Sequence, residues 1–199
     1  MIKLGLFFFL ITFNSWAEFL PESFKADFKQ SFVSYLSGKE KVSTGKIAYK
    51  YPSNIRLETL GPENLIYVGN KQKIWYYTAP FIRGEPGELI VKKAKEKNLS
   101  HFFDALKSGL KTNKKYSVKK ISKNEYELNF LSVMQKFSGV KKATIKIGSK
   151  KRFQDIEKIT ITYTDNKKVN IFLTNFKLDF KFTEEYFSFV PPKNTKITN

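Results

Sequence analysis

The segment GKIAYKYPSNIRLE, which spans residues 45–58, contains two runs of alternating apolar and polar side chains separated by a turn. In the first run Ile47 and Tyr49 lie between Lys46 and Lys50, and in the second Ile55 and Leu57 alternate with charged residues. Strict alternation is typical of strands with one buried face, and Pro-Ser-Asn is typical of a turn. The segment therefore predicts a β-hairpin whose apolar side chains share one face.

The same alternation recurs around residues 24–28, 159–163 and 176–182. Phe24 and Phe28 also fit a helical stripe, but the charged residues between them alternate strictly and favour a strand. Together with the turn signals along the chain, the pattern predicts about eleven short strands in a barrel or a strongly curved antiparallel sheet. The expected fold class is mainly β.

One segment, residues 100–110, has helical spacing instead. Its apolar side chains recur every three or four positions, and Asn98 or Ser100 could cap its first turn. Such a helix either closes one end of the sheet or forms a lid whose apolar face covers a cavity. The sequence alone does not separate these alternatives.

The first seventeen residues have the features of a secretory signal peptide. Lys3 precedes a short apolar run at residues 4–13, and Ser15 and Ala17 are the small residues that a signal peptidase reads. We expect cleavage after Ala17, which leaves residues 18–199 as one domain beyond the inner membrane. Because the chain has no cysteine, it has no disulfides and no lipid anchor on an N-terminal cysteine.

The formal net charge of +18 favours anionic partners, yet only three of the 36 basic residues are arginine. Reading of bases prefers the planar fork of arginine, so we expect no nucleic-acid partner. A solvated lysine-rich surface, or a codon bias without function, explains the charge equally well. The 20 phenylalanines and ten tyrosines indicate an aromatic core or an apolar cavity.

No catalytic or metal-binding motif is present. His101 is the only histidine, and Glu184 and Glu185 are adjacent, so on a strand they would point to opposite faces. The sequence also contains no glycine-rich phosphate loop. We therefore expect no enzyme activity, no metal and no cofactor.

Four segments, in this order, resemble the outer-membrane lipoprotein carrier (LolA) family, and together they cover nearly the whole mature chain. They are a first strand with small, Phe and Gln residues, a glycine-initiated hairpin, a strand, turn and Trp-aromatic strand, and a C-terminal FSFVPPKNTKI, at residues 23–30, 45–58, 65–77 and 187–197. The resemblance departs at the N-terminus, where only residues 18–22 precede the first strand instead of a helix.

The resemblance implies an unclosed β-barrel around an apolar cavity with helices as a lid. Family members carry triacylated lipoproteins through the periplasm, from an inner-membrane lipoprotein-releasing transporter to an outer-membrane acceptor. The acceptor is itself lipidated on cysteine, so the absence of cysteine favours a carrier, which we expect to be a monomer. Two alternatives stay open: a carrier of a free lipid or glycolipid, and a binding module that docks acidic proteins or polyanions through its lysines.

The alternation pattern and the resemblance together predict the residues of an acyl-chain site. The expected cavity wall is Ile47, Tyr49, Ile55, Leu57, Ile74, Tyr76, Ile159 and Ile161. The expected lid residues are Phe102, Phe103 and Leu106, which would fill the empty cavity. Tyr51 stands where the family has an arginine that holds the lid closed, and we expect it to pack against Phe102 or Phe103 as a weaker latch. Ile55 is expected near a wet cavity mouth, where a charge would be tolerated.

Overall fold

The computed structural model describes residues 18–198 except 35–36, 62–63, 83 and 96, so the expected signal peptide lies outside the described residues. Twelve strands of the described chain form one sheet, in the order β12-β6-β5-β4-β3-β2-β1-β11-β10-β9-β8-β7. Their bounds are β1 (Ser23–Val33), β2 (Glu40–Lys50), β3 (Asn54–Leu60), β4 (Leu65–Gly69), β5 (Lys73–Thr78), β6 (Gly87–Lys93), β7 (Tyr116–Ser122), β8 (Glu125–Phe130), β9 (Val140–Ile147), β10 (Ile156–Tyr163), β11 (Lys168–Leu178) and β12 (Thr195–Thr198).

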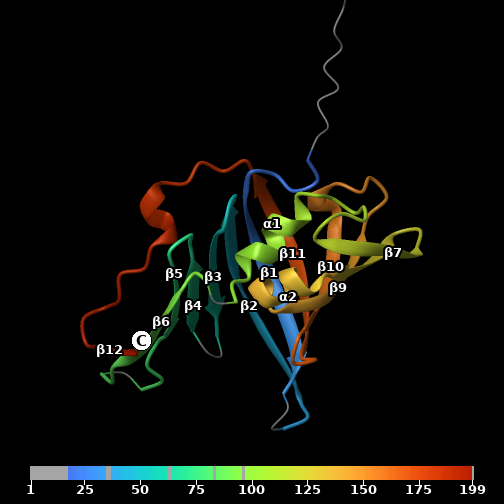
Figure 1. Ribbon diagram of the computed structural model, residues 1–199. Coiled ribbons are helices and arrows are strands. Elements are labelled where there is room, and N and C mark those ends of the chain that lie inside the picture. The colour runs from blue at the N-terminus through green and yellow to red at the C-terminus, as the bar shows by residue number, and fades with distance from the viewer. Residues whose placement is uncertain (1–17, 35–36, 62–63, 83, 96, 199) are drawn as a thin grey trace, which may run out of the picture.

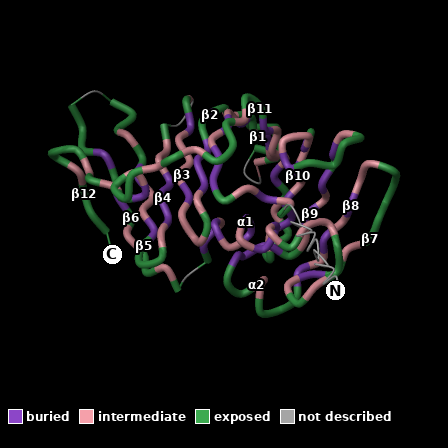
Figure 2. The backbone as a smooth tube through the Cα atoms, turned by 90° about the horizontal axis from the view of Figure 1, so that it is seen from above, coloured by how far each residue is buried: buried purple, intermediate pink, exposed green. Residues whose placement is uncertain are grey.

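The sheet is strongly curved and does not close. All neighbouring strands are antiparallel except β12 and β6, and the two edge strands, β12 and β7, lie on opposite sides of the molecule (Figure 1). Viewed from above, the sheet is an arc around its concave face (Figure 2). The mainly β, unclosed barrel predicted from the sequence is confirmed, with twelve strands rather than about eleven.

The hairpin of β1 and β2 forms the middle of the arc. Its register pairs Phe24 with Tyr49 and Ala26 with Ile47, and all four side chains are buried on the concave face. Phe28 pairs with Gly45, where an added Cβ would lie only 2.0 Å from the carbonyl oxygen of Glu58. The glycine that begins the decisive segment is therefore required by the close approach of β3, and the strand interpretation of residues 24–28 is confirmed.

Two short helices, α1 (Ser100–Leu106) and α2 (Ser132–Ser138), lie over the concave face (Figures 1 and 2). Helix α1 is shorter than the predicted residues 100–110, because the chain turns at Gly109, which has a φ of +74°. Its N-cap is Leu99 and not a capping side chain, although Asn98 Oδ1 accepts the backbone N–H of Ser100 at 2.9 Å. Within the described part of the chain, no helix is long and apolar enough to cross a bilayer.

The C-terminal segment differs from the strand predicted for residues 176–182. Strand β11 ends at Leu178, and the rings of Phe180, Phe182 and Tyr186 surround the ammonium group of Lys25 at 3.9, 5.2 and 4.7 Å. The alternation after Leu178 therefore reflects an aromatic cage instead of a strand. Two 3-10 turns, η1 (Phe153–Asp155) and η2 (Glu184–Phe187), complete the described elements, and Glu184 and Glu185 are both exposed on η2 instead of lying on a strand.

Candidate ligand-binding groove

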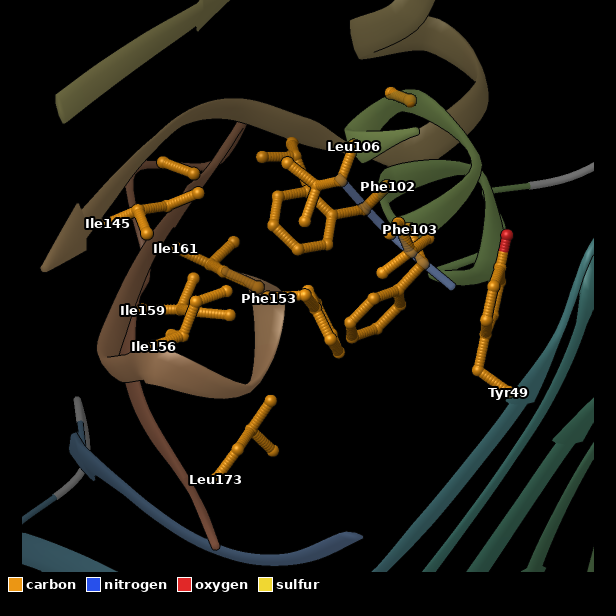
Figure 3. Packing of buried hydrophobic residues seen from close by; sticks show 14 of the residues in the cluster. Tyr49, Phe102, Phe103, Leu106, Ile145, Phe153, Ile156, Ile159, Ile161 and Leu173 are labelled. Carbon is orange, nitrogen blue, oxygen red and sulfur yellow. The ribbon is translucent and has the colours of Figure 1, made fainter. Parts of the chain in front are cut away.

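Helix α1 fills much of the concave face with aromatic and aliphatic side chains. Phe102, Phe103 and Leu106 are buried and point toward the isoleucines of β9 and β10 and toward η1 (Figure 3). The ring centroid of Phe103 lies 5.5 Å from that of Tyr49, and the ring of Phe102 lies 5.8 Å from Phe130. The three residues predicted to fill an empty cavity thus lie inside the curved sheet.

Most of the predicted wall residues are part of this same core. The buried ones are Ile47, Tyr49, Ile55, Ile74, Ile159 and Ile161. Only Leu57 and Tyr76 are half-buried and face open space. The expectation that Ile55 lies near a wet mouth is wrong, because its side chain has no exposed surface and a charge there would be buried without a partner.

The open space is a groove of about 490 Å³ between β1, β3–β5 and the segments at residues 97–99 and 163–169. Its apolar lining consists of Phe28, Phe32, Leu57, Leu65, Tyr67, Tyr76, Leu99, Tyr163 and Val169. Phe28 and Leu57 belong to alternation sets visible in the sequence, whereas Tyr67, Leu99 and Val169 come from other segments that only the fold brings to the groove.

The groove is also lined by polar side chains, namely Gln30, Thr59, Lys97, Ser138, Thr164, Asp165 and Lys167. Lys97 Nζ donates to Thr164 Oγ1 at 3.2 Å, and Lys167 Nζ lies 4.8 Å from the ring of Phe32. Burial raises the pKa of Tyr67, and it raises the pKa of Tyr163 to about 12, so both phenols stay neutral. The groove therefore presents uncharged aromatic walls together with two ammonium groups and the carboxylate of Asp165.

A half-buried carboxylate on α1 joins the helix to the hairpin of β2 and β3. Asp104 Oδ1 accepts the hydroxyl of Tyr49 at 2.6 Å and the backbone N–H of Ser53 at 3.0 Å, and Oδ2 accepts the Ser53 hydroxyl at 2.9 Å. The Nδ1 atom of His101 lies 3.6 Å from Oδ2, which is an ion-pair contact when the imidazole is protonated. We call Asp104, Tyr49 and Ser53 the Asp104 latch.

The electrostatics of the Asp104 latch favour the ionised carboxylate. Burial acts to raise the pKa of Asp104, but His101 and the hydrogen bonds from Tyr49 and Ser53 outweigh it, so the pKa is lowered. Burial also raises the pKa of Tyr49, with the neighbouring carboxylate adding to the effect. At neutral pH the latch is thus a charge-assisted hydrogen bond from a neutral phenol to an anion.

Tyr51 does not take the predicted place against Phe102 or Phe103. It follows the end of β2, is 39% exposed, and its ring lies 4.0 Å from Lys107 Nζ at the C-terminal end of α1. Lys107 also forms ion pairs with Glu18, at 2.6 Å, and with Glu22. The predicted latch at Tyr51 is therefore replaced by a cation–π contact, and the stronger fastening lies at Asp104, which the sequence analysis missed. The one available signal was that Asp104 is the only acidic residue in the helical segment.

The N-terminal segment closes the other end of the sheet. Leu20 is completely buried, and Phe19 packs edge-on against Phe153 with centroids 6.0 Å apart. Together with residues 107–111 and 151–154, this segment lines a second cavity of about 920 Å³, whose rim carries several charged side chains. A short extended segment thus occupies the position where the resemblance places a helix.

The described residues include no group of three or more His, Asp or Glu side chains arranged to hold a metal ion. The polar side chains that line the groove, such as Lys97, Thr164 and Asp165, accompany mainly apolar and aromatic walls. What the arrangement can do chemically is to enclose an apolar ligand.

The fold and the groove define a mainly β protein with an unclosed barrel whose apolar concave face is covered by helices. The family follows from a sequence comparison, in which the family described as "Outer membrane lipoprotein carrier protein LolA" matches residues 21–190. This chain belongs to that family, whose members are carrier proteins. No curated protein sequence matches the chain.

Solved structures with similar folds have low sequence identity to the chain. An uncharacterized conserved protein from Thermus thermophilus is 12% identical, with 90% of this chain and 91% of that chain covered and a TM-score of 0.49. A LolA superfamily protein from Nitrosomonas europaea is 9% identical, with 86% and 92% covered and a TM-score of 0.46. A domain described as an outer membrane lipoprotein-sorting protein, from Vibrio parahaemolyticus, is 12% identical, with 83% and 89% covered and a TM-score of 0.41. Likeness at this level carries no argument about function.

Proposed function

We propose that this protein is a soluble periplasmic carrier that shields the acyl chains of lipoproteins and takes them from the inner to the outer membrane. The observation that supports the proposal is that α1 covers the concave face with Phe102, Phe103 and Leu106, directly beside an apolar groove. If α1 moves outward, the space of its side chains joins the groove. The acyl-chain site then comprises the predicted wall and lid residues together with the groove lining.

The energetic need for such a site is large. Three acyl chains carry roughly 45 methylenes, and at ~0.8 kcal/mol each their exposure to water costs roughly 36 kcal/mol. A groove of about 490 Å³ is too small for three chains, so the helix has to leave for the full cargo to fit. An unclosed sheet can widen, whereas a closed barrel of about eight strands holds one small ligand.

Opening of α1 is resisted by few polar bonds. The Asp104 latch contributes hydrogen bonds to a charged group, typically about 1.5–3 kcal/mol each, and the ion pairs of Lys107 are largely exposed at the Glu18 and Glu22 side and contribute less. The apolar packing of α1 is replaced by contacts with cargo, so the net cost of exchange is modest. This balance suits a carrier that has no energy source of its own and must release what it binds.

The experiment that tests the proposal is mass spectrometry of the material that copurifies with the protein from the periplasm. Acylated lipoprotein in stoichiometric amount supports the lipoprotein carrier. A free lipid or glycolipid without protein supports the alternative carrier. An acidic protein or polyanion, without any acylated lipoprotein or lipid, supports the binding module. If a lipoprotein or a lipid is found, competition between that material and an acyl probe shows whether it occupies the groove.

A further inference from the structure

Several of the exposed apolar side chains lie at one end of the sheet. Phe81 is 95% exposed and its neighbour Ile82 is 58% exposed, in the loop between β5 and β6, and Leu60 at the end of β3 is 62% exposed. Val33 and Val42, in the β1–β2 hairpin, are exposed at the same end. We call this the loop end, made of residues 33–34, 37–42, 60–61, 64–65, 79–82, 84–86 and 164–168, which lie along the lower edge of the molecule in Figure 1.

Strand pairing brings these loops together. Thr44 pairs with Leu60, and Leu65 pairs with Thr78, so the β3–β4 turn and the β5–β6 loop leave the sheet at the same edge. The backbone N–H of Ala79 donates to the carbonyl of Asn64 at 3.0 Å and ties the two loops directly. The loops that carry the exposed apolar side chains are therefore held together by hydrogen bonds.

The apolar groove opens at the same end. Thr59 and Leu65 from β3 and β4, and Phe32 from β1, line it, and Lys167 from the β10–β11 turn lies at its rim. A ligand leaving the groove here passes between the loops that carry the exposed apolar side chains. The exposed apolar side chains and the opening of the groove thus lie on the same end of the molecule.

We propose that the loop end is a membrane-contact surface, on which Phe81, Ile82 and Leu60 insert among lipid headgroups of an anionic bilayer. Tips on separate loops that protrude from the sheet match a soft surface better than the flat, continuous patch of a protein interface. Lys39, Lys41 and Lys168 lie in or beside the β1–β2 hairpin that carries Val33 and Val42, on a chain with a net charge of +18, and favour anionic lipid. The loop end also carries Glu40, Glu85 and Asp165, so the apolar side chains contribute most of the attraction and the lysines bias it.

Contact at this end gives an acyl chain a short path. A chain that moves between bilayer and groove through open water exposes every methylene, whereas a groove opening pressed onto the headgroups exposes few. The role of the contact in cargo transfer rests on the proposed function, but the contact itself does not. The two are therefore tested separately.

The test is cosedimentation of the purified protein with vesicles of equal parts phosphatidylglycerol and phosphatidylethanolamine. We expect the protein to bind, to bind phosphatidylcholine vesicles more weakly, and to dissociate as salt is raised. The double variant Phe81→Ser/Ile82→Ser should partition at least about tenfold more weakly, because two inserted apolar side chains are lost. The matched control is Ile121→Ser, an exposed apolar side chain on β7 near the opposite end of the sheet.

A second measurement reports insertion directly. In the variant Phe81→Trp the emission of the new tryptophan should shift to shorter wavelength on addition of the anionic vesicles, and in Ile121→Trp it should not. If the double variant binds vesicles as the parent does, or if the Phe81→Trp emission does not move, the proposal is overturned. It is also overturned if the parent ignores vesicles and instead forms dimers that the double variant loses, since the surface then joins two copies of the chain. Without vesicles, the parent and the double variant should bind an acyl probe equally well. If the parent does not bind the probe, the carrier function is contradicted, but the membrane contact is not.

Discussion

At the scale of single residues, Asp104 has the most consequential position in the molecule. It is the one carboxylate that α1 turns toward the sheet, and its oxygens accept bonds from Tyr49 and Ser53. A carboxylate withdrawn from water is tolerated only where such donors meet it. The hydrogen bonds of Asp104 therefore fix the position of the helix on the sheet, while the apolar side chains of the helix supply most of the contact area.

The first prediction is that Asp104→Asn loosens α1. Asparagine keeps one oxygen for the donors but loses the charge, so the free energy of unfolding should fall by about 1–3 kcal/mol. Urea unfolding of parent and variant measures the difference. The control Glu157→Gln removes an exposed ion pair with Lys146 and should change stability by less than about 1 kcal/mol.

This difference should depend on pH. The folded-state pKa of Asp104 lies below its ordinary value, so the latch contributes fully above about pH 4 and is lost as the pH falls through the folded-state pKa. Parent and Asp104→Asn should therefore converge in stability once the pH falls below the folded-state pKa of Asp104. An undiminished difference below that pKa means that packing, and not charge, distinguishes them.

The second prediction separates the groove from the core. Leu57 is half-buried and lines the groove, so Leu57→Glu should keep the fold and weaken binding of an acyl probe by at least roughly tenfold. Ile55→Glu buries a charge without a partner and should unfold the protein or cost several kcal/mol, on the order of 3–5. Circular dichroism and probe titration report the two effects, with the exposed Ile121→Glu as control. Equal probe binding by Leu57→Glu and parent would remove Leu57 from the site.

At the scale of elements, α1 is a short helix that owes its stability to its surroundings. A helix of seven residues is unstable alone in water, and this one has no side-chain cap at Leu99. It persists because four of its side chains are completely or almost completely buried against the sheet, namely Phe102, Phe103, Ala105 and Leu106. A ligand that occupies the same apolar space removes that support.

The third prediction follows for hydrogen exchange. Amide exchange in α1 should rise when the protein is loaded with an acyl ligand, and it should already be raised in unloaded Asp104→Asn. Amides of β1, in the middle of the sheet, serve as the control and should stay protected. Unchanged protection of α1 on loading would show that the helix is a fixed part of the core and that only the groove accepts ligand.

At the scale of the whole molecule, the two ends of the curved sheet are different. At one end Leu20 and the ion pairs of Lys107 hold the N-terminal segment beside a cavity of about 920 Å³ with a charged rim. At the other end lies the apolar groove, together with the exposed apolar side chains of the loop end. An acyl chain is better matched by the apolar groove than by the cavity with the charged rim. The N-terminal segment is part of the packing at its end, so its processing affects that packing.

The fourth prediction therefore concerns processing. We expect the exported protein to begin at Glu18, because Ser15 and Ala17 fit a signal-peptidase site. Glu18 forms an ion pair with Lys107. The intact mass of the periplasmic protein measures where the chain begins. A mass that includes Lys3 would contradict both export by cleavage and the closure of this end by residues 18–22.

Much of the fold could be predicted from local patterns. Alternation in residues 45–58 correctly indicates two strands, because a period of two places alternate residues on one face of a sheet. It predicts burial less well, since Ala48 is buried and Leu57 is only half-buried. The same rule fails after Leu178, where Phe180 and Phe182 alternate but surround Lys25. Alternation tells which residues share a face but not what covers that face.

The sequence by itself determined the mainly β architecture, the apolar set of the hairpin, and the aromatic face of α1, since each is a periodicity within a few neighbouring residues. Only the tertiary structure decided that Ile55 is core while Leu57 lines a groove, that Leu20 closes one end, and that Phe81 stands at the open end. It also decided the latch, in which Asp104 meets Tyr49 and Ser53 from 55 and 51 residues away in the chain. The physical reason is that burial and hydrogen bonding between distant segments depend on how the curved sheet brings them together, and no local pattern records that distance.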